Sequence, residues 1–157
     1  MRALALNVAI ALIWMLLTEI TMVSTTVGFV LGFGLLAAFP AVWASKDYVR
    51  RTVAAAFFLR VFGAAFLRSS WEVLRISLSG EIDRLRPRVL TYDVTGMNAF
   101  EILLLTHCIS LTPGTTTVDV SDDFTRLTLH ALDAPDPEAV RRDIDETLKR
   151  GILAFTR

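Results

Sequence analysis

The side chains in this sequence that could bind a metal or act as nucleophiles are few. Cys108 is the single cysteine, and His107 and His130 are the two histidines. Because His107 and Cys108 are adjacent, a helix would point their side chains in different directions, so we do not expect them to share a metal ion. The sequence contains no Gly-x-Ser-x-Gly motif and no phosphate-binding loop. These residues predict neither an enzyme nor a metal or cofactor site.

Glu19 is the one carboxylate that could serve ion transport within the apolar part of the chain. From residue 3 to residue 44 it is the only acid, and no Lys or Arg is present. An ion path through lipid needs ionisable or carbonyl-rich groups near the bilayer midplane. Glu19 instead lies between two apolar runs, where the chain turns at the far surface. We therefore interpret Glu19 as a solvated turn residue and expect no ion path in this segment.

The charges divide the chain into two parts. Of the 157 residues 54% are hydrophobic, and the formal net charge is zero. Residues 1–87 nevertheless carry nine Lys and Arg against five Asp and Glu, whereas residues 88–157 carry seven against eleven. A basic part beside apolar segments is typical of the cytoplasmic side of a membrane, and the acidic part argues against nucleic acid as a partner. The lone cysteine excludes an intrachain disulfide and fits a cytoplasmic domain.

Two apolar runs near the N-terminus predict a helical hairpin in the membrane, which we assign to residues 1–48. The runs occupy residues 3–17 and 27–44, and residues 18–26 between them form a polar turn. At 1.5 Å per residue the first run is about 22 Å long, against a hydrocarbon core of about 30 Å. Because the second run follows at once, we interpret the first as an anchor rather than a cleaved signal peptide.

Glycines suggest how the two helices of the hairpin pack, and basic residues suggest how the hairpin is oriented in the membrane. Gly28 and Gly32 have the spacing that lets helix backbones approach closely in lipid. Glycine is also common in membrane helices without this role, and both interpretations leave the hairpin intact. Lys46, Arg50 and Arg51 follow the second run, which places this end of the hairpin on the cytoplasmic side. With two spans, the N-terminus returns to the same side.

A basic amphipathic helix and a linker follow in residues 49–87. At 100° per residue, Arg60, Arg68 and Arg75 fall within one arc of a helix over residues 53–79. Such a helix lies in the headgroup region, or it forms a third span. In the second case, burying Arg60 in the membrane would cost roughly 2.5 to 3.5 kcal/mol. We favour the interfacial position, because a third span would move the rest of the chain to the side opposite the preceding basic cluster.

Residues 88–157 predict a small α+β domain with the order β-α-β-β-α. Residues 90–94 alternate apolar and polar side chains as a strand, and residues 97–111 form an apolar helix. Alternation at residues 117–120 and again at 126–129 predicts a β-hairpin. The predicted fold is therefore a membrane α-helical hairpin followed by a small α+β cytoplasmic domain.

The final helix has clear signals at its start and along its buried face. Asp136 is the predicted N-cap, with Pro137 at the first helical position. The predicted buried stripe comprises Val140, Ile144, Leu148, Ile152 and Phe155. Ion pairs four residues apart are predicted for Glu138 with Arg142, Asp145 with Lys149, and Glu146 with Arg150.

The sequence from residue 110 to residue 133, SLTPGTTTVDVSDDFTRLTLHALD, followed by Asp136-Pro137-Glu138, resembles the E subunit of the Mrp (Mnh) multisubunit cation/proton antiporters. The N-terminal NVAIALIWMLLT and GFVLGFGLL are similar to the same family, so the resemblance covers nearly the whole chain. It implies a bacterial inner-membrane complex that exchanges Na⁺ or other monovalent cations for protons. In that complex the larger subunits would carry the ion path, and the E subunit would be an accessory, non-catalytic component that supports assembly and activity. The implied partners are the other subunits and the lipid bilayer.

The family motif falls on particular positions of this chain. These are Leu111, Thr112, Pro113, Gly114 and Thr115, followed by Val118, Asp119 and Val120. The resemblance leaves open whether they contact neighbouring subunits or only shape the fold. The sequence departs from the family pattern at Glu19 and at His107-Cys108.

A membrane-anchored ligand-sensing module is the alternative hypothesis. It requires a polar pocket in the distal domain, for which Asp119, His130 and Asp133 are the candidates. An enzyme is the third hypothesis, and the sequence offers it neither a nucleophile nor a metal constellation.

Overall fold

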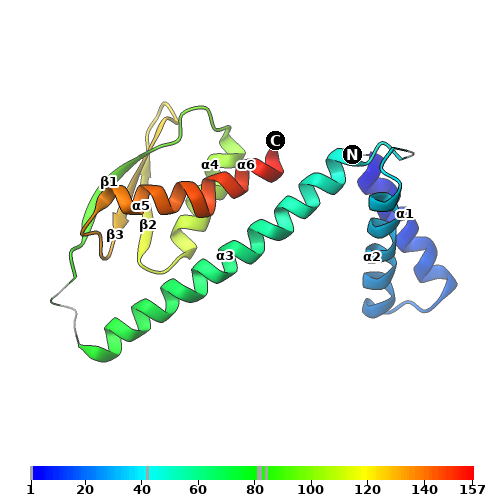
Figure 1. Ribbon diagram of the computed structural model, residues 1–157, viewed down its shortest axis with the longest axis horizontal. Helices are drawn as coiled ribbons and strands as arrows, with labels where there is room; N and C mark the ends of the chain where they lie inside the picture. Colours follow the sequence, from blue (N-terminus) through cyan, green and yellow to red (C-terminus); the bar gives the residue numbers. More distant parts are fainter. Residues whose placement is uncertain (1, 42, 81–82, 84) are drawn as a thin grey trace. The chain divides into compact units, whose positions relative to one another are not determined.

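The computed structural model describes residues 2–41, 43–80, 83 and 85–157, and the chain divides into two compact units, Met1–Val53 and Ala54–Arg157. In the first unit, α1 (Arg2–Leu17) and α2 (Met22–Ala38) pack against each other as an antiparallel hairpin (Figure 1). With 16 and 17 residues they are about 24 and 26 Å long, which is shorter than a hydrocarbon core of about 30 Å.

The turn between α1 and α2 is shorter than the sequence predicts. The sequence suggests a polar turn through residue 26, whereas α2 already begins at Met22. Thr21 is the N-cap, and its hydroxyl accepts a backbone N–H of the first helical turn at 3.1 Å. At the other end α2 stops at Ala38 rather than near residue 44. Pro40, which lacks an N–H and restricts the residue before it, follows two positions later.

Helix α3 (Lys46–Ser79) is a continuous helix of 34 residues that begins earlier than predicted. The buried Ser45 precedes it, donating its hydroxyl to the Leu36 carbonyl at 2.7 Å, and the Ser45 carbonyl accepts the Val49 N–H. Among the described residues, α3 is the helix whose length and composition would allow it to cross a membrane. Helices α1, α2 and α4 (Ala99–Leu111) are apolar but shorter. The predicted linker over residues 81–88 lies partly outside the described residues.

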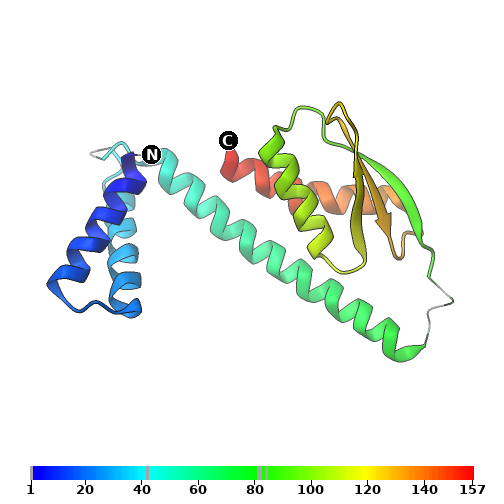
Figure 2. The ribbon, with the colours of Figure 1, turned by 180° about the vertical axis from the view of Figure 1, so that it is seen from behind.

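The second unit contains a three-stranded antiparallel sheet with the strand order β1-β3-β2. The strands are β1 (Arg88–Asp93), β2 (Thr115–Val120) and β3 (Arg126–Ala131). Helix α4 joins β1 to β2, and the last helix follows β3, so the predicted order β-α-β-β-α is confirmed. Both helices cover the same face of the sheet (Figure 2), and Leu90, Leu127 and Leu129 are buried there.

Strand β2 departs from the simple alternation that the sequence predicts. A β-bulge between Thr117 and Asp119 leaves Val118 outside the register with β3. Val118 is consequently 62% exposed, although alternation would place it on the same face as the half-buried Val120. A bulge adds one residue to one strand, and a polar–apolar pattern alone does not reveal it.

The last helix runs without a break through α5 (Pro137–Asp143), η2 (Ile144–Lys149) and α6 (Arg150–Thr156), and its middle part is π-helical. Its buried residues recur every four positions at Ile144, Leu148 and Ile152. On a regular α-helix such a repeat rotates by about 40° each time. The wider π turn, with five residues between donor and acceptor, counteracts this rotation and keeps the stripe against the sheet.

The ion pairs on this helix differ in part from the prediction. Asp145 and Lys149 pair at 3.8 Å as expected. Glu138, however, pairs with Arg141, three residues on, and Arg142 reaches the N-cap carboxylate at 3.3 Å. Arg141 also donates to the Thr91 carbonyl of β1 at 2.8 Å, and this hydrogen bond holds the Arg141 side chain on the side of the helix that faces β1.

Candidate functional site

The helices of the hairpin meet along a seam of small residues. On α1 the buried residues are Ala3, Asn7 and Ala11, and on α2 they include Gly28 and Gly32. Both series are spaced by four residues, so each occupies one face of its helix. A Cβ atom on Gly28 would lie 3.0 Å from the Ala11 Cα, and one on Gly32 would lie 3.3 Å from the Asn7 backbone oxygen. The two glycines therefore lie where the helix backbones approach closely.

Asn7 is the buried polar side chain in this seam. Its Nδ2 donates to the hydroxyl of Tyr48, in the first turn of α3, at 2.8 Å. Within the described part of the chain, no conventional donor reaches its Oδ1. That oxygen lies where a Cβ on Gly32 would be placed, so any side chain at position 32 would collide with it. Asn7 thus links all three helices of the first unit.

Helix α3 packs one of its faces on the rest of the second unit. Phe58 is only 7% exposed, and its ring centre lies 5.9 Å from that of Phe62 and 5.5 Å from that of Phe155. Gly151 makes this possible, because a Cβ there would lie 2.5 Å from the Phe58 ring. Farther along, Val73 approaches within 3.8 Å of where a Cβ on Gly114 would lie. The direct contacts of α3 with the domain are therefore those of Phe58 and Phe62, whereas Val73 borders a hollow together with Gly114.

Two of the three predicted basic residues of α3 lie at the edge of this contact. Arg60 and Arg68 border a hollow that also includes Thr147 of η2. The guanidinium of Arg60 lies 5.3 Å from the centre of the Phe57 ring. Arg75 lies farther along the same helix, two turns beyond Arg68.

The family motif forms the turn between α4 and β2. Thr112 is the C-cap of α4, and its hydroxyl donates to the Cys108 carbonyl at 2.9 Å. The Thr115 hydroxyl donates to the Ile109 carbonyl at 3.2 Å, and the Gly114 carbonyl accepts the Leu132 N–H at 2.8 Å. Two of these bonds satisfy carbonyls that the end of a helix leaves free. The fold thus explains Thr112, Gly114 and Thr115 of the motif.

Of the other motif residues, Leu111, Val118 and Asp119 are exposed, Pro113 is half-buried, and Val120 packs against the core. Leu111 is 60% exposed at the end of α4, and Asp119 is exposed on β2 opposite Thr128. Pro113 and its neighbours in the turn border a second hollow, of about 390 Å³, beside α3. These positions are available to a neighbouring chain, whereas the hydrogen bonds of Thr112 and Thr115 are internal.

The three candidates for a ligand pocket lie apart. Asp119 faces a hollow beside His107, whereas Asp133 accepts the Arg86 N–H at 3.2 Å and borders the hollow beside α3. His130 lies on β3 between its cross-strand partners Val89 and Thr116. Among the residues that the structure describes, no three His, Cys, Asp or Glu side chains come together as metal ligands. The ligand-sensing hypothesis gains no support from this arrangement.

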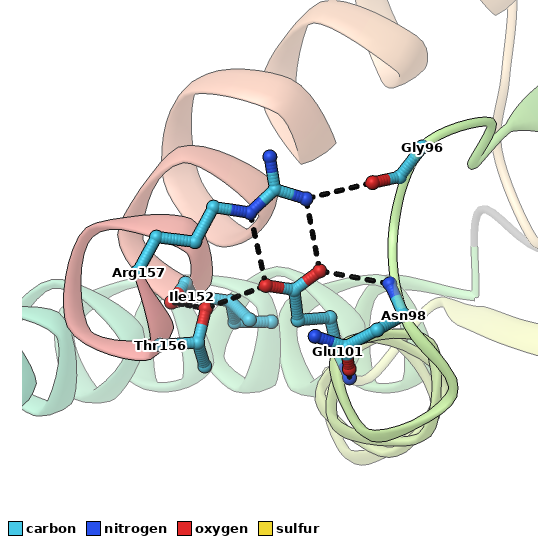
Figure 3. Close-up of polar contacts among 6 residues, drawn as sticks. All are labelled: Gly96, Asn98, Glu101, Ile152, Thr156 and Arg157. Carbon is cyan, nitrogen blue, oxygen red and sulfur yellow. Dashed lines mark hydrogen bonds and ion pairs between the residues drawn. The ribbon is translucent and has the colours of Figure 1, made fainter.

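A buried carboxylate that the sequence analysis did not identify joins α4 to the C-terminus (Figure 3). Glu101 is completely buried, and its oxygens accept from Arg157 Nε at 3.1 Å and Nη2 at 3.0 Å. They also accept the Thr156 hydroxyl at 2.8 Å and the Asn98 N–H at 2.9 Å. The hydrogen bonds from Arg157, together with those from Asn98 and Thr156, lower the pKa of Glu101 from 4.5 to about 2. The Asn98-x-x-Glu101 capping box was the available sequence signal.

Comparison with known proteins identifies the family. The family described as "Na+/H+ ion antiporter subunit" matches residues 7–155. The E subunit of the Na(+)/H(+) antiporter of Alkalihalophilus pseudofirmus is 32% identical over 153 residues, covering 97% of this chain and 96% of that protein. The chain belongs to the E-subunit family of Na⁺/H⁺ antiporters. The corresponding E subunit of Bacillus subtilis is 29% identical over the same length and coverage.

The family assignment extends over both units of the chain. The matched residues 7–155 include most of the hairpin, α3 and the distal domain, so the resemblance seen at residues 110–133 is confirmed over that range. A solved structure of the membrane-bound sulfane sulfur reductase, an archaeal respiratory membrane complex, contains a chain of the same fold. It has 19% identity and a TM-score of 0.56, and the alignment covers 96% of this chain and 98% of that one.

The motif of the E-subunit family yields a direct stability prediction at Gly114. Its φ of +95° lies in a region that a β-branched residue rarely adopts. We expect Gly114→Val to lower the free energy of unfolding by about 1 to 3 kcal/mol. The control is Gly63→Ala on α3, where a Cβ would meet no described atom within 4 Å. Thermal unfolding followed by circular dichroism measures both variants, and equal melting temperatures for Gly114→Val and the native chain would contradict the prediction.

Proposed function

We propose that this chain is an accessory, non-catalytic subunit of a multisubunit antiporter that exchanges monovalent cations such as Na⁺ for protons across the bacterial inner membrane. Its membership of the E-subunit family carries the proposal. The apolar surface of the hairpin supports it, because such a surface must be covered by lipid or by neighbouring subunits. The exposed apolar residues of α1 and α2 include Leu4, Leu12, Ile13, Leu16, Val23, Val30, Leu31 and Leu35.

Antiport activity in membrane vesicles tests this function. Deleting the gene for this chain should abolish or strongly reduce Na⁺-dependent proton efflux in everted vesicles, and expression of the chain from a plasmid should restore it. Growth at high Na⁺ or alkaline pH should likewise be impaired in the deletion strain and restored by the plasmid. Unchanged antiport in the deletion strain would contradict the proposal.

We further propose that the distal domain is cytoplasmic and that α3 lies along the membrane surface. The contacts of Phe58 and Phe62 with the domain support this position. A helix that carries a charged domain along one face is poorly suited to the hydrocarbon core, where that domain would lose its water. The basic residues at the start of α3 agree with a cytoplasmic end of the hairpin.

Cysteine labelling tests this topology. Val89 is 67% exposed on the open face of the sheet and Ile20 is 79% exposed at the turn of the hairpin. An impermeant maleimide should label Val89→Cys in everted vesicles and Ile20→Cys in right-side-out cells. The native chain, whose Cys108 is buried, serves as the blank. Labelling of Val89→Cys from outside the cell would place α3 across the membrane.

A further inference from the structure

The face of α3 that points away from the domain is apolar and uncovered. At 100° per residue, Leu67, Trp71, Leu74 and Leu78 fall within an arc of about 60°, opposite Phe58. All four are exposed, and Trp71 is 68% exposed. Phe58 lies in the core of the second unit, so the domain covers one side of α3 and leaves this apolar arc free.

Three arginines accompany the apolar arc. Arg60 lies within it, and Arg68 and Arg75 flank it on one side. Among the described residues, no carboxylate lies within ion-pair distance of any of the three. The last helix differs, since Arg141, Arg142, Lys149 and Arg157 each pair there with a carboxylate. The guanidinium groups of Arg60, Arg68 and Arg75 are therefore available to an anionic partner, although Glu72 and Asp143 border the same hollow as Arg60 and Arg68.

The combination of an apolar arc and unpaired arginines identifies the kind of partner. Guanidinium groups match phosphate oxygens geometrically, and an exposed tryptophan beside leucines is typical of a helix in the headgroup region. A cation–π contact with the Phe57 ring places the Arg60 guanidinium beside the apolar arc, where a headgroup phosphate can reach it. We propose that α3 binds anionic phospholipids, with Arg60, Arg68 and Arg75 contacting their phosphates and Trp71 inserted at the level of the glycerol backbone.

This inference rests on the surface position of α3 proposed above, and it further specifies that the lipids bound by α3 are anionic. Each arginine near an anionic surface favours binding by a factor of about five. Three of them together should favour anionic over zwitterionic lipid by roughly 100-fold at low ionic strength, and salt should weaken the preference.

Quenching of Trp71 by brominated lipids tests the inference on the full chain. In a Trp14→Phe, Trp43→Phe background Trp71 is the sole tryptophan, and phenylalanine keeps the Cβ of Trp14 in the hairpin seam. The chain is placed in phosphatidylcholine nanodiscs that contain a tenth of brominated phosphatidylglycerol or of brominated phosphatidylcholine. We expect quenching by brominated phosphatidylglycerol to be roughly threefold stronger, since anionic lipid should be enriched around α3.

A matched pair of variants isolates the arginines. Replacing Arg60, Arg68 and Arg75 by glutamine should equalise the two lipids, whereas replacing the exposed Arg88, Arg126 and Arg150 by glutamine removes the same charge and should preserve the difference. Equal quenching by both lipids in the native background would overturn the inference but leave the surface position intact. No quenching by either lipid would overturn it by showing that α3 does not contact lipid. Labelling of Val89→Cys independently reports whether the proposed topology has failed.

Discussion

Replacing Gly28 by valine should separate the two helices of the hairpin, whereas replacing Gly34 by valine on the same helix should not. A Cβ on Gly28 would lie 2.9 Å from the Trp14 Cβ and 3.0 Å from the Ala11 Cα. Neither atom is the end of a flexible side chain, so the helices themselves must move. A Cβ on Gly34 would meet nothing within 4 Å among the described atoms.

The comparison isolates the seam because both substitutions change helix propensity equally. Overpacking of a tight interface costs about 1 to 3 kcal/mol, and we expect Gly28→Val to lie at the upper end. The measurements are the amount of chain recovered from membranes and the temperature at which the detergent-solubilised chain loses its native fold. Gly28→Val should lower both the recovered amount and the unfolding temperature, and Gly34→Val should match the native chain in both. Equal losses in the two variants would show that the close approach at Gly28 is unimportant.

Replacing Arg157 by glutamine should destabilise the distal domain although the residue is the last in the chain. The substitution leaves the buried Glu101 carboxylate without its cation. Breaking a fully buried ion pair costs about 3 to 5 kcal/mol. Because the Arg157 side chain is 56% exposed, we expect about 2 kcal/mol, or roughly 10 °C in the melting temperature of a unit of this size. Arg150→Gln, which removes an exposed cation from the same helix, is the control.

The pH dependence of the destabilisation by Arg157→Gln distinguishes loss of the ion pair with Glu101 from loss of side-chain packing. Glu101 has a folded pKa of about 2 against 4.5 for the free side chain, so it binds protons more weakly in the folded state. Its stabilisation is therefore complete above pH 4.5 and is lost as the pH falls toward 2. The difference between native and Arg157→Gln melting temperatures should shrink over the same range. A difference that stays constant from about pH 6 down to about pH 2 would contradict the ion-pair explanation.

The sequence carried enough information for the elements of the distal domain but not for its irregular features. Alternation at Leu90, Leu127 and Leu129 and the cap at Asp136 are local signals, and the structure follows them. The four-residue repeat of Ile144, Leu148 and Ile152 spans an arc of about 80°, which a regular α-helix also accommodates, so it did not predict the π-helical turn. The β-bulge at Val118 also left no trace in the alternation of polar and apolar residues.

Interactions between distant positions were the hardest to predict. Asn98 and Glu101 form a capping box that is visible in the sequence, but the contact of Glu101 with Arg157 joins residues 56 positions apart. Asn7 and Tyr48 are similarly separated by 41 positions. For α3, composition alone allowed either a membrane span or a surface helix. The packing of its aromatic residues on the distal domain was needed before the surface position could be argued from contacts.

Affinity purification of the tagged chain from native membranes tests the central claim most directly. If the chain is an accessory antiporter subunit, mass spectrometry should find the large antiporter subunits in amounts comparable to the chain itself. Gly28→Val should reduce their recovery, and Gly34→Val should not. Purification of the native chain without these subunits, under mild detergent conditions that preserve the complex in a control carrying the tag on a large subunit, would contradict the account.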